Sequence, residues 1–110
     1  MERIINIAND YSNVLGGRWI RLGPFSGEDF YNTKLEPAFR EARDNGDTLV
    51  IELDGTKGYP SSFLDQSFGH LARTYGTDTV RSVLRFRGAV FGWVAEYIDT
   101  KVWTTPKAQK

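Results

Sequence analysis

Length, composition and charge describe a small globular domain. The 110 residues are 40% hydrophobic and 25% charged, and 14 basic residues balance 14 acidic ones. Such a chain can bury one core, and its zero net charge argues against nucleic-acid binding through bulk positive charge. The chain has no cysteine, which excludes disulfides and thiolate metal sites. It also lacks the roughly 18-residue apolar run of a membrane span and the pattern of a signal peptide, so we expect a cytoplasmic protein without a membrane or nucleic-acid partner.

Four segments have the composition of β-strands. Arg3–Ala8 is β-branched and alternates in polarity, and Arg18–Gly23 follows a Gly-Gly turn. Thr48–Leu53 is almost continuously apolar, which is typical of a central strand covered on both faces. Val80–Phe86 predicts a further strand. The chain therefore supplies at least four candidate strands.

Helical spacing of apolar residues alternates with these strands. Ser26 begins a capping pattern, but Pro37 does not fit the interior of a helix, so we predict a short turn at Ser26 and a separate helix from Leu35 to Asp44. Two more helices are predicted over Ser62–Tyr75 and Ala89–Thr100. Asn45-Gly46 and Gly76 supply stop signals for the first two of these three helices.

The order of elements, β-β-α-β-α-β-α, predicts an α/β fold. We expect a small domain with a mixed sheet of four to five strands and helices packed mainly on one face. The domain should span residues 1–103, and residues 104–110 should form a flexible C-terminal tail.

The segment DTLVIELDGTKGYPSSFLDQSFGHL, residues 47–71, carries most of the functional information. A buried strand leads into a glycine-rich turn, and two serines then open an amphipathic helix. Helix starts have unpaired backbone N–H groups and a partial positive charge, so they attract anions. Ser62 with Asp65 also fits a capping box, which would give this hydroxyl a purely structural role. Capping has no need of Ser61.

Several short motifs resemble one bacterial family. They are Gly17-Arg18, the GPFSGE run at 23–28, the LEPA run at 35–38 and the DGTKGYPSSFLD run at 54–65. Together they are similar to the STAS-like family of unknown function, over about residues 4–98, with SSFLD as the most specific part. That family is named for its likeness to the STAS domains of anti-sigma factor antagonists and of anion-transporter tails.

The resemblance implies a regulatory role for the serine pair. In the antagonists, a partner kinase phosphorylates a serine in the loop between a central strand and the next helix, and this switches partner binding off. The Ser61-Ser62 pair matches their Asp-Ser-Ser segment, with Ser61 at the phosphorylated position and Ser62 beside it as a second candidate. The chain departs from the antagonists at Pro60, where they usually carry an acid.

Other residues near the serines could contribute to a binding surface. The loop from Asp54 to Gly58 either makes a tight connection or forms a shallow anion or nucleotide cradle with Lys57 as a point charge. It is not a Walker motif. Arg18 could reach the loop of Ser61, or lie as a solvated charge on an edge strand. The candidate partner- or anion-binding residues are Asp54, Gly55, Thr56, Lys57, Gly58, Tyr59, Ser61, Ser62, Asp65 and Arg18.

No set of residues predicts catalysis, a metal or a cofactor. A hydrolase would bring together a serine, a histidine and an acid, but His70 lies more than two helical turns, roughly 12 Å, beyond Ser61. The acids Glu28, Asp29, Asp65 and Glu96 are dispersed without metal-ligand spacing. We therefore expect a protein that is not an enzyme.

Three functions remain open on the sequence. The one we favour is a regulatory module that binds a protein partner, such as a histidine-kinase-like ATPase, through Gly58–Asp65, with phosphorylation of Ser61 as the switch. The alternatives are a small anion- or nucleotide-binding module and, for a short phage-like chain, a phage-type inhibitor of a bacterial defence complex. A homodimer is compatible with all three, and aromatic residues near Trp93 and Tyr97 could either form an interface or close the core.

Overall fold

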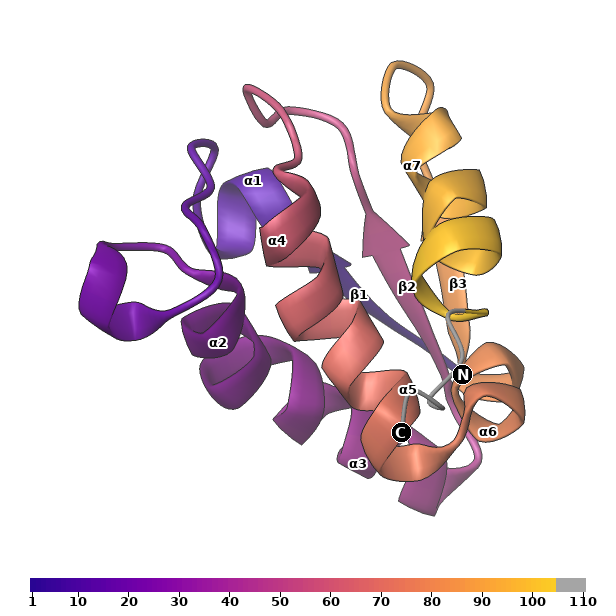
Figure 1. Ribbon diagram of the computed structural model, residues 1–110. Helices are drawn as coiled ribbons and strands as arrows, with labels where there is room; N and C mark the ends of the chain where they lie inside the picture. The colour runs from indigo at the N-terminus through magenta and orange to yellow at the C-terminus, as the bar shows by residue number, and fades with distance from the viewer. Residues whose placement is uncertain (105–110) are drawn as a thin grey trace.

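The computed structural model of the protein describes residues 1–104, so residues 105–110 of the predicted tail lie outside the described part of the chain. Figure 1 shows the arrangement of the elements. The strands are β1 (Glu2–Asn6), β2 (Thr48–Glu52) and β3 (Leu84–Arg87). The α-helical segments are α1 (Ile7–Asp10), α2 (Gly27–Phe30), α3 (Glu36–Asn45), α4 (Ser61–Leu64), α5 (His70–Tyr75), α6 (Thr77–Val83) and α7 (Gly92–Tyr97). Short 3-10 and π turns lie at Ile20–Leu22, Tyr31–Leu35, Asp65–Gly69 and Ile98–Val102.

The sheet of the described residues has three parallel strands in the order β1-β2-β3. Ile4 pairs with Val50, and Val50 pairs with Arg85. The predicted α/β class is correct, but the sheet is neither mixed nor four- to five-stranded. Each parallel connection must cross over through helical structure, which is what the long segments between these strands provide.

The predicted strand at Arg18–Gly23 is wrong. This segment is a loop that contains the 3-10 turn Ile20–Leu22. The N–H of Ile20 donates to a carboxylate oxygen of Glu28 at 2.9 Å, and the carbonyl of Arg18 accepts from the N–H of Glu28 at 3.0 Å. Because α2 takes up these backbone groups, they are not available to a neighbouring strand.

The predicted strand at Val80–Phe86 is correct only in its second half. Val80 and Val83 are buried on one side of α6, since a spacing of three residues places them on one helical face. The strand β3 begins at Leu84. The guanidinium of Arg85 donates to the carbonyls of Arg81 and Leu84, both at 2.8 Å, and so caps the end of α6.

Pro37 does not break the helix that contains it. A π turn at Tyr31–Leu35 joins α2 to α3, and the N–H of Glu36 bonds to the carbonyl of Tyr31, five residues back. This widened turn directly precedes the proline, which has no N–H to donate. The predicted break is therefore wrong, whereas the predicted stop at Gly46 is confirmed by its left-handed φ of 72°.

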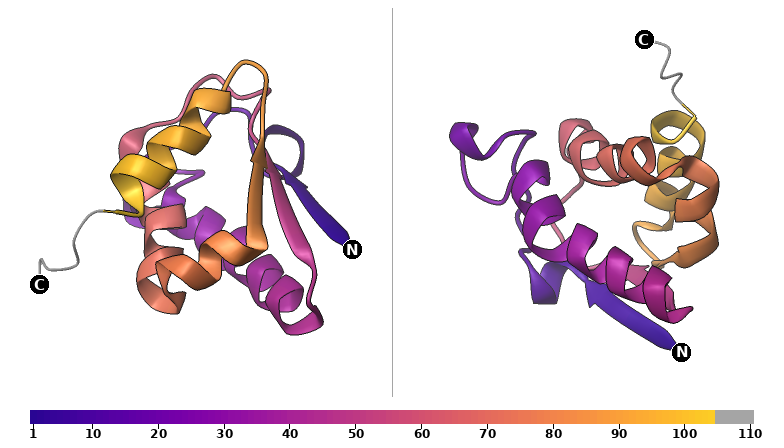
Figure 2. Two further views of the ribbon diagram at one scale, coloured as in Figure 1. Left: turned by 90° about the vertical axis from the view of Figure 1, so that its right-hand side faces the viewer. Right: turned by 90° about the horizontal axis from the view of Figure 1, so that it is seen from below.

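All longer helices cover one face of the sheet, as Figure 2 shows in its left view. The core between the two layers contains the apolar residues that helical spacing had predicted to face inward. Phe30, Phe39, Phe63, Phe68, Leu71 and Ile98 are all fully buried. The prediction of helices mainly on one face is confirmed.

On the opposite face of the sheet, charged side chains take the place of the helical layer. The register places Ile4, Val50 and Arg85 side by side on this face. Ile4 is 51% exposed, whereas Val50 is only 2% exposed. Arg87 on β3 pairs with Glu2 on β1 at 3.6 Å and with Glu52 on β2 at 3.7 Å. Because Glu2 and Arg87 reach toward each other across the middle strand, their side chains shield Val50.

Candidate functional site

The serine pair lies at the start of a long helix, as predicted, but neither serine is its cap. The N-cap position belongs to Pro60, and Ser61 is the first helical residue. The capping box proposed for Ser62 and Asp65 is therefore wrong. Ser61 is exposed and Ser62 is half-buried, and neither hydroxyl forms a hydrogen bond with any described residue.

The backbone at this helix start is also unsatisfied. The first intrahelical bond there runs from the N–H of Leu64 to the carbonyl of Pro60 at 3.2 Å. Within residues 1–104, the N–H groups of Ser61, Ser62 and Phe63 find no acceptor. A side-chain cap is the usual partner of such groups, and proline cannot supply one. The helix therefore presents three free donors and the positive end of its dipole next to an exposed hydroxyl.

Asp65, one turn further along, anchors a small ionic cluster. One of its carboxylate oxygens accepts from Arg18 at 2.5 Å and the other from Arg73 at 3.1 Å. Partial burial opposes ionisation of this carboxyl, but the hydrogen bonds and charges of the two arginines outweigh it and lower the pKa of Asp65. The cluster joins the loop that carries Arg18 to the helix that begins at Ser61.

Asp54, at the end of β2, has an internal role. Its carboxylate accepts backbone N–H bonds from Ala89 at 2.6 Å, Val90 at 3.0 Å and Phe91 at 2.8 Å. The bonds from Phe91 and Ala89 in particular lower the pKa of Asp54. Asp54 thus ties the β2 loop to the connection that precedes α7.

The rest of the loop before α4 is held closely to the body of the protein. Gly55 has φ of 107°, a conformation that L-residues rarely adopt, so the turn needs glycine there. The hydroxyl of Tyr59 donates to the carbonyl of Leu53 at 2.6 Å, and burial raises the pKa of Tyr59 to about 12. Thr56 is buried, whereas Lys57 and Pro60 are exposed. In this loop, the side chains that are available to a partner are therefore those of Lys57 and Pro60, in its second half.

The structure thus divides the predicted site residues into two groups. Ser61, Ser62, Asp65 and Arg18 come together at the helix start, where a Cβ added at Gly17 would lie 3.8 Å from the hydroxyl of Ser62. Asp54, Gly55, Thr56 and Tyr59 shape and fix the approaching loop. Lys57 and Gly58 belong to the same loop, between Thr56 and Tyr59.

Arg73 was missed as a member of the site by sequence reasoning. It lies two helical turns beyond Asp65, a spacing that suggests no direct contact. The two residues nevertheless meet, because the π turn Asp65–Gly69 lies between them and Arg73 also donates to the carbonyl of Asp65 at 3.1 Å. No sequence signal marks a π turn at this place, so the contact could be found only from the fold.

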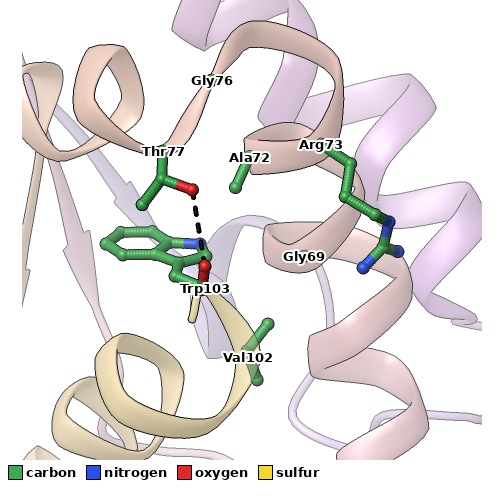
Figure 3. Close-up of a pocket in the computed structure, with 7 residues that line it drawn as sticks. All are labelled: Gly69, Ala72, Arg73, Gly76, Thr77, Val102 and Trp103. Atoms are coloured by element: carbon green, nitrogen blue, oxygen red, sulfur yellow. Dashed lines mark hydrogen bonds between the residues drawn. The ribbon is translucent and has the colours of Figure 1, made fainter. Parts of the chain in front are cut away.

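Away from the serines, a hollow lies between α5, the start of α6 and the end of the C-terminal π turn, as Figure 3 shows. Its polar groups are all engaged. The hydroxyl of Thr77 donates to the carbonyl of Trp103 at 3.4 Å, and the indole N–H of Trp103 donates to the carbonyl of Phe68 at 3.0 Å. The guanidinium of Arg73 bonds to Asp65. With no free polar group directed into it, this hollow is a packing feature.

His70 is a packing residue in this structure. Its ring meets the ring of Tyr31 edge to face, with centroids 4.6 Å apart. Burial and the charge of Arg73 lower its pKa. No group of three or more metal-ligating side chains occurs in the described part of the chain. In that same part, no helix is long and apolar enough to cross a membrane.

Comparison with known proteins gives one match. Residues 26–90 match a family described as a STAS-like domain of unknown function. The matched region runs from the cap of α2 to the connection before α7, and so includes the whole candidate site apart from Arg18. No curated protein and no solved structure matches the chain.

Proposed function

Because the family match at residues 26–90 spans more than half of the chain, the chain belongs to the STAS-like domain family, and we propose that it is a non-enzymatic module that binds a protein partner through Gly58–Asp65. A STAS-like domain suggests a regulatory module. The proposal adds a surface, a partner and a switch to that general role.

The observation that carries the proposal is the state of Ser61. Its side chain is exposed and unbonded, at a helix start whose first three N–H groups are unpaired within the described residues. A serine kept only for stability would cap the helix, as Ser26 does for α2 by accepting from the N–H of Asp29 at 3.0 Å. Ser61 is instead available to another molecule.

Phosphorylation at Ser61 would suit this environment. A phosphate group adds about two negative charges near neutral pH. The free N–H groups and the helix dipole would stabilise those charges, so the fold tolerates the modification. A partner that places an acidic or apolar group against the helix start would be repelled. A histidine-kinase-like ATPase, acting as both kinase and binding partner, is the partner class we propose.

The test combines chemistry with binding. The protein is incubated with a histidine-kinase-like ATPase and ATP, and its mass is measured; we expect the gain of one phosphate in wild type and in Ser62→Ala, and no gain in Ser61→Ala. Binding to the same ATPase should persist in Ser61→Ala and be lost in Ser61→Glu. Ser82→Glu, which changes an exposed serine on α6, is the control and should bind normally. Equal binding of Ser61→Ala and Ser61→Glu would contradict the switch.

A second candidate function rests on the same free donors. Exposed Lys57 could join these N–H groups in holding an inorganic anion or a nucleotide phosphate. Millimolar ATP or phosphate would then raise the melting temperature by mass action. A shift that disappears in Lys57→Ala would favour this function, and the absence of a shift would leave partner binding as the better account.

A further inference from the structure

A projecting loop, Gly17–Phe25, is the most prominent apolar feature outside the core. It stands away from the helical layer beyond α2, at the far left of Figure 1. At its tip Ile20 is 49% exposed and Leu22 is 70% exposed, and Phe25 at its end is 43% exposed. Trp19 and Arg21 complete the sequence WIRL, and aromatic residues and arginine are enriched in protein interfaces.

The loop is held in one conformation by its backbone. At its base Gly16 donates to the carbonyl of Phe25 at 2.8 Å, and Gly27 donates to the carbonyl of Gly17 at 2.8 Å. At its tip Leu22 donates to the carbonyl of Trp19 at 3.0 Å. Phe25 is the only described residue other than glycine with a positive φ, at 56°, which costs conformational energy. A preorganised apolar loop loses little entropy when it binds.

Two side chains of opposite charge lie here: Arg21 on the loop and Glu28 just after it. Arg21 and Glu28 both line a shallow hollow, together with Trp19 and Ile20. Neither charge forms an ion pair within residues 1–104, and Glu28 accepts only the N–H of Ile20. The surface therefore offers an apolar projection, a hollow, a cation and an anion within a few residues.

We propose that the projecting loop binds the same loop of a second copy of this chain. A twofold axis brings a surface against itself, so each of its features must meet its complement on the same surface. Here Leu22 of each copy enters the hollow of the other, and Arg21 of each copy pairs with Glu28 of the other. This inference does not depend on Ser61 or on an external partner.

Another exposed apolar pair does not have this self-complementarity. Val90, in the connection before α7, and Trp93, in the first turn of α7, are 69% and 57% exposed. The only charged residue within α7 is the acid Glu96, which would face its own copy across a twofold axis and repel it. Val90 is thus as exposed as Leu22 but outside the proposed interface, which makes it a matched control.

The first test measures the molecular mass of the full chain by sedimentation equilibrium from about 1 μM to about 1 mM. Wild type should approach twice 12.5 kDa with rising concentration. Leu22→Asp should weaken self-association at least about tenfold, and Val90→Asp should leave it unchanged. A monomer at every concentration, or a dimer that is weakened by Val90→Asp but not by Leu22→Asp, overturns the proposal.

The second test exchanges charges. Arg21→Glu alone and Glu28→Arg alone each place like charges in both contacts of a dimer, so both variants should be monomeric. Mixed together they restore two opposite pairs, and the mixture should form a heterodimer. Circular dichroism checks that Glu28→Arg, which loses the acceptor for Ile20, is folded. If both variants are folded and the mixture stays monomeric while wild type dimerises, the twofold arrangement is wrong.

Discussion

Two helix starts in this protein each carry a serine but differ in how their backbone N–H groups are bonded. At α2, Ser26 is 1% exposed and caps the helix, and loop carbonyls accept the N–H groups of Gly27 and Glu28. At α4, Pro60 occupies the cap position and the first three N–H groups have no acceptor among the described residues. A hydroxyl residue at a helix start therefore indicates a cap only when the chain before it also turns back onto the helix. Where it does not, the hydroxyl is available for binding or modification.

Adding a methyl group at the first residue of α2 and at Gly58, two residues before the cap of α4, should give the largest contrast. A Cβ at Gly27 would lie 2.6 Å from the carbonyl oxygen of Phe63, whereas a Cβ at Gly58 would meet nothing within 4 Å. Gly27→Ala should lower the free energy of unfolding by about 3 kcal/mol, because α2 and α4 must move apart, and Gly58→Ala by less than about 1 kcal/mol. Urea denaturation measures both. Similar losses in the two variants would show that the helix starts are packed alike.

Removing the two hydroxyls should give the next largest contrast. Ser26→Ala leaves the N–H of Asp29 without its acceptor in a buried setting and should cost about 1 kcal/mol. Ser61→Ala removes no hydrogen bond and should change stability by less than about 0.5 kcal/mol. The same urea series reports both values. A cost at Ser61 equal to that at Ser26 would mean that Ser61 caps its helix after all.

The cluster that joins the two regions should show a dependence on pH. The pKa of Asp65 is lowered in the folded protein, so its contribution is fully present above its unfolded pKa of about 3.9 and is lost as pH falls through the lower folded value. Asp65→Asn should be less stable than wild type by at most about 1 kcal/mol at pH 7, since the pair is partly exposed and screened by water. The difference should shrink below about pH 4. Urea midpoints of both proteins between pH 7 and pH 3 measure it, and a difference that grows on acidification would contradict the assignment.

A charge at Ser61 should give the smallest effect and the opposite sign. Ser61→Asp places an anion beside free N–H groups and should stabilise the fold by a few tenths of a kcal/mol, less at high salt. Ser82→Asp, near the end of α6, is the control and should destabilise slightly, because the dipole is reversed there and the hydroxyl of Ser82 no longer donates to the carbonyl of Thr79 at 2.7 Å. Thermal melts at low and high salt compare the two. A clear loss of stability in Ser61→Asp would argue against a phosphate at this position.

Patterns of apolar residues gave correct predictions for features that depend on a single helix or strand. The buried residues Phe63, Phe68 and Leu71 follow from helical spacing, and the strand at Thr48–Glu52 follows from a run of β-branched residues. The extra strand at Arg18–Gly23 failed because alternation is a local property, while a strand also needs a neighbour with free backbone groups. In this segment α2 takes those groups.

The candidate site was predicted only in part, because some of its contacts join residues that are distant in the chain. The exposure of Ser61 follows from its place at the start of a helix after a turn. The roles of Asp54 and Asp65 do not, because their partners at residues 89–91 and at Arg18 are distant in the chain. Asp65 was expected to form a capping box at the start of its own helix. In the fold, its carboxylate instead pairs with Arg18 and Arg73.

Residue types and their spacing within single elements were enough to predict the class of fold, the buried faces of the helices, the family and the position of the serines. The number of strands in the sheet, the continuous helix through Pro37 and the free donors of one of the two helix starts became clear only in the folded protein. Those outcomes depend on which distant backbone and side-chain groups meet, and a hydrogen-bonding group taken by one partner is no longer available to another.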